Sequence, residues 1–366
     1  MRMVPLSAPD ITDAERAAVL RVLDGPQLCM GPELHGFEAE MARYIGVEDA
    51  VAVSSGTAAL HLALVALGIQ AGDEVVIPSF AFVALANVVM QAGARPVFAE
   101  IDEETLNITA ATVEAVITAK TRAVIVVHTF GVPAEMAKLR ALCERRRLRL
   151  IEDACEALGA TADGRRTGSF GDAAVFGFYP NKQITMGEGG VVTMRGADAC
   201  ARLRRLRNQG RAPGDGWLEQ GEAGFNYRVS DINCALGRVQ LSRIGEILEK
   251  RRQAAEHYLY ILGGIDGVRL PVMEVPGRVI SWFVYVVRIE GAGRRELVAE
   301  KLAEAGIATS RYFAPIHWTR LWRSELSLQV TERVAGEVLA LPFYTRITLE
   351  EQERVGAALR RAILAV

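Results

Sequence analysis

Short apolar segments alternate with helical patterns over the first two-thirds of the chain. The segments are mostly rich in Val, Ile or Phe, and several are apolar on both faces, as strands are when helices cover a sheet. Helical patterns lie between several of them, at 57–67 and at 133–146 for example. Strand–helix alternation predicts an α/β fold with a mostly parallel sheet. Seven strands are expected, at Ala50–Val53, Glu74–Ile77, Pro96–Ile101, Ala123–His128, Leu148–Glu152, Ala173–Phe178 and Gly190–Met194.

The pattern changes after about residue 240. Leu241–Leu262 has the apolar spacing of one long helix, and Trp282–Ile289 has the composition of a strand. Helices are expected at 294–305 and 349–364. We therefore predict a large domain over 1–240 and a small C-terminal α+β domain over 241–366. Because no low-complexity linker separates them, the two are expected to pack together.

The composition excludes several classes of protein. Of 366 residues, 50% are apolar, which is too many for a disordered chain, and the net charge of −2 offers no field to hold nucleic acid or a membrane. The five cysteines are odd in number and form no C-x-x-C pair, so neither disulfides nor a metal site is expected. The start of the chain lacks the apolar core of a signal peptide, and the apolar stretch Phe80–Met90 is too short to span a bilayer. A cytoplasmic protein is predicted.

Two segments place polar groups where expected strands end. Small hydroxylated residues at Ser54–Leu60 join a strand to a helix, where free N–H groups can bind an anion; an ordinary Ser N-cap is the alternative. Carboxylates end the strand in Ile151–Glu156. In open α/β sheets this edge faces the ligand crevice, although a carboxylate there can also cap the next helix.

A third segment, Gly177–Gln183, sets Lys182 in a loop followed by the Gly-rich Gly187–Gly190. A lysine is usually solvated. This one has apolar or conformationally special neighbours, which would desolvate the amine and make it nucleophilic. A fourth, Gly224–Asp231, is polar and aromatic and precedes a helix. The chain has no P-loop, no G-x-S-x-G elbow and no H-E-x-x-H motif.

Together these segments resemble the pyridoxal-phosphate-dependent sugar aminotransferases of the DegT/DnrJ/EryC1/StrS family. The matching stretches occur in the family's order from residue 54 to 318: SSGTAALHLAL, IPSFAFVALAN, IEDACEALGA, FYPNKQITMGEGG, GFNYRVSDINCALG and RYFAPIHW. The resemblance implies fold type I of the enzymes that use pyridoxal 5′-phosphate (PLP). That fold has a seven-stranded sheet domain and a small C-terminal domain.

The resemblance also implies roles for particular residues. Lys182 would be joined covalently to PLP and would carry protons once released, and Asp153 would pair with the pyridinium nitrogen. Phe82 would stack on the cofactor ring. Gly56 and Thr57 would hold the phosphate.

Further roles concern the partner subunit and the substrate. Asn226 would reach the phosphate of the neighbouring subunit, so the site would require a homodimer. Glu156 would lie near the cofactor O3′. Tyr179, Arg228 and His317 are weaker candidates for binding substrate, since a lone histidine is more often structural.

The sequence departs from the family pattern at four positions. Gly177 stands where the family often has a phosphate-binding Ser, and Glu156 stands where Gln is common. Leu158 replaces a frequent His, and Ala81 a frequent Thr. A basic run could contact a nucleotide diphosphate or form a solvated helix face; it comprises Arg202, Arg204, Arg205, Arg207 and Arg211.

The function implied is a homodimeric aminotransferase that takes an amino group from L-glutamate, releases 2-oxoglutarate and delivers the group to a nucleotide-linked keto-sugar. An aminotransferase for a cyclitol ketone and a PLP-dependent dehydratase stay open, although the family's dehydratases carry His in place of Lys182. A non-catalytic regulatory or binding protein on the same fold is a third alternative, and Asp153 together with Lys182 argues against it.

Overall fold

The seven expected strands form one sheet in the computed structural model, which describes residues 3–212, 214–216 and 218–366. The order across the sheet is β1-β9-β8-β5-β4-β2-β3. All seven predictions are confirmed within two residues at either end. The strands are β1 (Val51–Val53), β2 (Glu74–Pro78), β3 (Arg95–Ala99), β4 (Thr121–Val127), β5 (Arg149–Asp153), β8 (Ala173–Gly177) and β9 (Gly190–Met194).

Most neighbours in this sheet run parallel, and only β9 runs against both β8 and β1. Consequently β1, β2, β4, β5 and β8 all end at the same edge, and β9 begins there. The loop 178–189 between β8 and β9 lies at this edge and carries Lys182. This topology gathers the loops that follow five separate strands.

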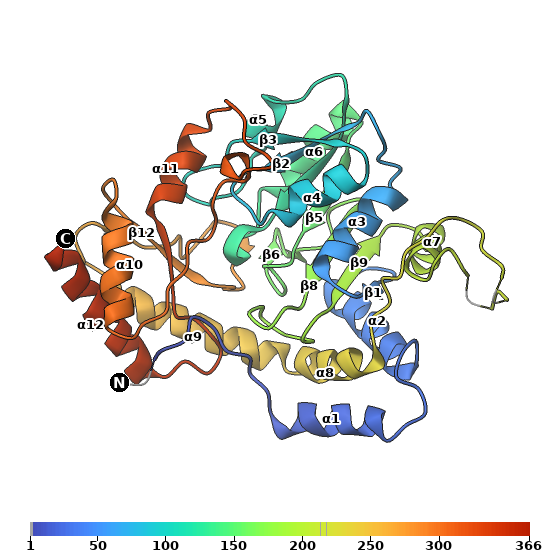
Figure 1. The fold of residues 1–366 in the computed structure, drawn as a ribbon, viewed down its shortest axis with the longest axis horizontal. Coiled ribbons are helices and arrows are strands. Elements are labelled where there is room, and N and C mark those ends of the chain that lie inside the picture. Colours follow the sequence, from blue (N-terminus) through green and yellow to red (C-terminus); the bar gives the residue numbers. More distant parts are fainter. Residues whose placement is uncertain (1–2, 213, 217) are drawn as a thin grey trace.

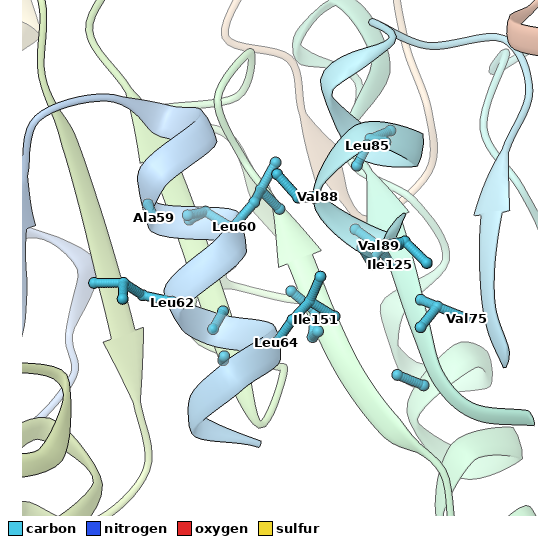
Figure 2. Close-up of a cluster of buried hydrophobic side chains, with 14 of the residues drawn as sticks. Ala59, Leu60, Leu62, Leu64, Val75, Leu85, Val88, Val89, Ile125 and Ile151 are labelled. Carbon is cyan, nitrogen blue, oxygen red and sulfur yellow. The ribbon is translucent and has the colours of Figure 1, made fainter. Parts of the chain in front are cut away.

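Helices cover both faces of the sheet (Figure 1). On one face pack α3 (Gly56–Ala66), α4 (Ala84–Gln91) and α7 (Ala197–Arg207), and Figure 2 shows leucines and valines of α3 and α4 pointing toward β4 and β5. The other face is covered by α5 (Ala110–Glu114) and α6 (Met136–Arg146). The last of these begins three residues later than expected, because Pro133 precedes the helix.

The long helix expected from Leu241 is two helices, so that prediction was wrong at its start. They are α8 (Asp231–Ser242) and α9 (Ile244–Leu262), nearly in line along one side of the molecule (Figure 1). Arg243 interrupts them at φ −99° and ψ 4°, and its guanidinium binds the carboxylates of Asp10 and Glu15. Leu241 and Ile244 keep helical spacing across the break because both face the same core.

The C-terminal part forms a second, smaller sheet of β10 (Val268–Arg269), β12 (Tyr285–Ile289) and β13 (Val338–Leu341). It packs with α9, α10 (Arg294–Glu304) and α12 (Leu349–Ala365) around a core of its own. Val4 joins this part through a bridge to Ile307, and both chain ends lie beside it (Figure 1). The division of the chain at residue 240 stays a prediction.

The strand expected at Trp282–Ile289 begins only at Tyr285, because Trp282 has a left-handed backbone with φ 51°. The remaining elements are α1 (Asp13–Leu23), α2 (Pro32–Ile45), α11 (Gln329–Glu337), β6 (Thr161–Ala162), β7 (Arg165–Arg166), β11 (Arg278–Val279), η1 (Thr129–Gly131) and η2 (Ile316–Trp318). Within the described ranges, no helix has both the length and the apolar character needed to cross a bilayer.

Candidate active site

A cavity of about 500 Å³ opens at the edge where the parallel strands end. Loops that follow β1, β2, β5 and β8 line it, and the segment around Phe283 closes it from the smaller part of the molecule. Seven of the ten residues predicted for the site lie in its wall: Gly56, Thr57, Phe82, Asp153, Glu156, Tyr179 and Lys182.

Lys182 projects from the loop between β8 and β9. Its side chain is 16% exposed, and its backbone N–H donates to the carbonyl of Tyr179 in a tight turn. The amine Nζ lies 3.7 Å from Oε1 of Glu156 and 4.0 Å from the centre of the Phe283 ring. An amine held at a carboxyl group and an aromatic face, with an open cavity in front, can act as a nucleophile or carry a proton.

Asp153 ends β5, and its carboxylate faces the cavity while accepting the N–H of Cys155 at 3.0 Å. The preceding Glu152 points to the opposite face of the sheet, as neighbours in a strand must. There the Glu152 carboxylate is fully buried, 3.1 Å from Nε2 of His128, and accepts three backbone N–H groups. One carboxylate of this pair therefore fixes the end of the strand, and the other faces the cavity.

Glu156 lies between Lys182 and the loop after β4. Its Oε2 accepts the N–H of Phe130 at 2.9 Å, and its backbone carbonyl accepts the side-chain amide of Gln183. Burial raises the pKa of the Glu156 carboxyl, while the neighbouring Lys182 charge and the Phe130 N–H pull this pKa the other way without cancelling the rise. A proton is thus favoured on this carboxyl at a higher pH than on an exposed glutamate.

The start of α3 forms a narrow cradle. Ser55 caps the helix by accepting the N–H of Ala58 at 3.1 Å, and the exposed Thr57 lies in the first turn. A Cβ on Gly56 would lie 3.0 Å from Sγ of Cys155 and 3.2 Å from Cα of Gly177. Gly56 therefore lets the start of α3 pack closely against the end of β8, and the helix start offers N–H groups to an anion.

Gly177, one of the four positions at which the sequence departs from the family pattern, packs against Cys155. A Cβ on Gly177 would lie 3.2 Å from the Cys155 sulfur, so this thiol occupies the space beside a side chain at position 177. Burial raises the pKa of the Cys155 thiol well above its ordinary value, which keeps it a neutral packing group.

Two aromatic side chains lie at the mouth of the cavity. Phe82 is 63% exposed and Tyr179 is 55% exposed. Large exposed rings at a cavity mouth are suited to contact a cofactor, a substrate or a second subunit.

Three predicted site residues lie outside the cavity wall. His317 is 1% exposed, with Nδ1 at 2.6 Å from Oγ of Ser79 and Nε2 at 3.2 Å from Oε1 of Glu332. Arg228 donates to Oδ1 of Asn208 at 3.0 Å.

Asn226, the third of them, is exposed and forms an isolated β-bridge with Asn208. An exposed position away from the cavity of its own chain leaves its amide free to meet another molecule.

The basic run binds carboxylates of the same chain. Arg204 forms ion pairs with Asp49 and Glu38, and the buried Arg207 also pairs with Glu38. Arg202 and Arg205 share Glu222. Arg204 and Arg207 therefore hold α7 against α2 and the segment before β1, whereas Arg202 and Arg205 bind the loop that follows α7.

Phe283, Tyr312 and Phe313 line the cavity but were not predicted for it. Their rings form a continuous wall, with Tyr312 stacked on Phe283 at 6.4 Å and on Phe313 at 5.2 Å. The stretch RYFAPIHW contains two of these aromatics. No motif in the sequence around Phe283 marks it as a site residue, because only the fold brings its ring close to Lys182.

This architecture defines a class of protein. A seven-stranded, mostly parallel sheet whose strand ends carry a lysine and an aspartate in one cavity, closed by a small α+β part, is fold type I of the PLP-dependent transferases. The sequence matches the DegT/DnrJ/EryC1/StrS aminotransferase family over residues 9–360, and the chain belongs to that family. It is therefore an aminotransferase.

Individual relatives resemble it along nearly their whole length. The GDP-perosamine synthase of Caulobacter vibrioides is 38% identical over 370 residues, covering 99% of this chain and 98% of the relative. The aminotransferase TlmJ of Streptoalloteichus hindustanus superposes with a TM-score of 0.95 at 35% identity over 99% of each chain. The PLP form of Spr1654 from Streptococcus pneumoniae superposes with a TM-score of 0.93 at 26% identity over 99% of each chain.

Proposed function

We propose that this aminotransferase uses PLP to move an amino group from L-glutamate to a nucleotide-linked keto-sugar. The observation that carries the proposal is the placement of Lys182, Asp153 and Glu156 in one cavity at the end of the parallel strands. The name of the Caulobacter relative supports a nucleotide-sugar substrate, and the PLP form of the Streptococcus protein supports the cofactor.

The residues present fit PLP. The cavity of about 500 Å³ contains a lysine for the covalent attachment, an aspartate for the pyridinium nitrogen and, at Gly56, a cradle that any side chain would crowd. Phe82 would cover the ring, and Thr57 with the N–H groups of α3 would bind the phosphate. When bound, PLP supplies an electron sink for the bond-breaking at the amino-bearing carbon.

The protein's own groups would then carry the protons. Lys182, once released from the cofactor, is the amine that would take the proton from the amino donor and return it on the other side of the reaction. Asp153, ionised, would keep the ring nitrogen protonated. Glu156 would hold a proton near the amine and the cofactor O3′, because a neutral carboxyl can donate a hydrogen bond there and an ionised one cannot.

Substrate contacts are proposed at the mouth of the cavity, where Tyr179 is exposed. Arg228 and His317 stay predictions as substrate ligands, and their side chains bind Asn208, Ser79 and Glu332 within the chain. A cyclitol ketone in place of the sugar remains the alternative substrate. A regulatory protein without catalysis would have no need for both Lys182 and Asp153.

We also propose that the working unit is a homodimer in the cytoplasm. The exposure of Asn226, its position outside its own cavity and the exposed rings of Phe82 and Tyr179 support a second subunit at this face. The five cysteines are free thiols, which suits a reducing compartment.

The test is a panel of NDP-4-keto-sugars, NDP-3-keto-sugars and cyclitol ketones offered to protein first converted to the pyridoxamine form with L-glutamate. Return of the absorbance band of the lysine-bound cofactor reports which acceptor takes the amino group. A response to a nucleotide-linked keto-sugar supports the proposal. A response only to cyclitol ketones, or no conversion by L-glutamate, contradicts it.

A further inference from the structure

Arg251 on α9 is 2% exposed, and within the described ranges its hydrogen bonds all go to main-chain carbonyls. Its Nη1 lies 3.1 Å from the carbonyl oxygens of both Trp282 and Phe283, and its Nη2 lies 3.4 Å from the carbonyl oxygen of Lys182. Its Nε has no hydrogen-bond partner. One side chain therefore joins two segments. The first is the loop 178–189, which carries Lys182 and is called here the catalytic loop, and the second is the segment around Phe283 that closes the cavity.

Burial of the Arg251 guanidinium away from water costs free energy. Taking an ion out of water costs several kcal/mol, and a carboxylate partner normally recovers part of it. Arg207, which is also fully buried, has such a partner in Glu38 at 2.5 Å. Over the described ranges, no carboxylate lies within ion-pair distance of Arg251, and burial lowers its pKa to about 10 although the Asp10 charge opposes this. The charge is compensated instead by the three carbonyls and by the Phe343 ring at 5.4 Å, so its contacts are directed at the two segments that meet beside Lys182.

The segment 281–283, called here the strap, is held in a strained conformation. Trp282 has φ 51°, which costs a bulky residue about 1–3 kcal/mol and persists only when the surroundings enforce it. The N–H of Ser281 donates to Gly131 and that of Phe283 to Phe130, at 3.1 and 3.3 Å. Phe130 is itself left-handed at φ 57°, so two strained segments lie against each other behind the cavity.

The strap reaches the catalytic loop at three points. The Phe283 ring covers the Lys182 amine at 4.0 Å, the side chain of Gln183 donates to Oγ of Ser281 at 3.0 Å, and Arg251 links the carbonyls of both segments. Loss of the Arg251 donors would remove the link between the backbones of Phe283 and Lys182 and leave the Gln183–Ser281 hydrogen bond to join the two segments.

We propose that Arg251 is a positioning residue, which holds the strap and the catalytic loop together so that the Phe283 ring and the Glu156 carboxyl direct the Lys182 amine into the cavity. The inference rests on the proposed role of Lys182 as the attachment point of PLP. Misplacement of a reacting group by about 1 Å can cost about 100-fold in rate.

The experiment measures how fast PLP attaches to the apo-protein, by absorbance and by borohydride trapping with peptide mapping. The variants are Arg251→Met, which keeps the volume without the donors, and Arg251→Lys, which keeps the charge and some donors. Arg207→Met is the matched control, because it also loses a buried guanidinium but lies in α7, outside the cavity wall. The Tm of each apo-protein is measured by thermal unfolding, so that the trapping rates of variants with a similar loss of stability can be compared.

If Arg251 positions the lysine, R251M slows trapping at Lys182 by about tenfold or more, whereas R207M with a similar loss of Tm changes it by less than about twofold. R251K should recover part of the rate, and kcat of the loaded R251K should fall with KM for L-glutamate unchanged. Equal trapping rates in R251M and R207M would overturn the inference. If R251M does not fold, the trapping rate at Lys182 is compared between R251K and R207M instead, and equal rates would again overturn the inference.

Phe283→Leu separates the ring from the backbone anchor. It keeps the carbonyl that Arg251 binds, so it should slow trapping without the drop in Tm caused by R251M. Trapping on a lysine other than Lys182 in the wild type would contradict the proposed function itself. Trapping at Lys182 that is insensitive to Arg251 would contradict only the positioning role.

Discussion

The amine of Lys182 lies 3.7 Å from Oε1 of Glu156, while the other oxygen of this carboxyl accepts the N–H of Phe130. The pair is shielded from water, with the lysine side chain 16% and the glutamate side chain 8% exposed. A titratable carboxyl therefore lies beside the lysine that is proposed to attach PLP.

Replacement of Glu156 by Gln tests which form of the carboxyl is used. Burial raises the pKa of the Glu156 carboxyl, so its protonated form persists to a higher pH than that of an exposed glutamate. Glutamine mimics that form, and we expect E156Q to retain most activity and to flatten the alkaline limb of the pH–rate profile. A large loss of turnover with cofactor still bound would show that the ionised carboxylate is required.

The same pKa shift predicts a change in stability with pH. A carboxyl whose pKa is raised on folding binds more protons in the folded than in the unfolded state between the ordinary value of 4.5 and the raised value. Its contribution to the free energy of unfolding is therefore lost as the pH rises through that window. Urea unfolding of the apo-proteins should show E156Q gaining stability relative to the wild type as the pH rises above 4.5. A constant difference across this range would contradict the shift.

Replacement of Lys182 by Ala should abolish turnover and preserve cofactor binding. Asp153 and the start of α3 remain to hold PLP, but no other described lysine lines the cavity to move the proton. We expect kcat to fall by about 100- to 10,000-fold, the range of a lost general acid–base group. Borohydride reduction of the wild type with peptide mapping checks the assignment, and a label on another lysine would refute it.

A mixed dimer tests whether Asn226 serves the neighbouring subunit. Chains carrying Lys182→Ala and chains carrying Asn226→Asp are co-expressed with different tags, and the doubly tagged species is purified. One of its two sites then contains neither change, so about half of the wild-type activity should return in this species. If purified heterodimers stay inactive, Asn226 works within its own chain.

The packing of Cys155 against Gly177 predicts that a serine at position 177 is harmful here. A side chain there would lie 3.2 Å from the Cys155 sulfur and would force the cradle apart. We expect Gly177→Ser to destabilise the protein by about 1–3 kcal/mol and to weaken PLP binding. Adding Cys155→Ala should restore both, as measured by thermal unfolding and PLP titration. A G177S protein as stable as the wild type would show that the thiol can move aside.

Local sequence determined the elements and the two residues on which the proposed chemistry depends. The seven strands could be predicted because an apolar run of this length is buried wherever the chain folds. Asp153 ends one such strand and Lys182 lies in the loop after another, and parallel strands bring their ends to one edge. The resemblance to the family supplied their roles.

Tertiary structure decided the rest, because it depends on residues far apart in the chain. The apolar spacing of Leu241 and Ile244 predicts one continuous helix. In the structure the helix breaks at Arg243, whose guanidinium forms ion pairs with the distant Asp10 and Glu15. Adjacent glutamate and aspartate look alike in sequence, yet strand alternation buried Glu152 against His128 and left Asp153 in the cavity. Phe283 lies at Lys182 through contacts between segments about 100 residues apart, in which Arg251 donates to the carbonyls of both residues and Gln183 donates to Ser281. The energies of such contacts depend on burial and on partners about 30–230 residues away, which no local pattern of residues records.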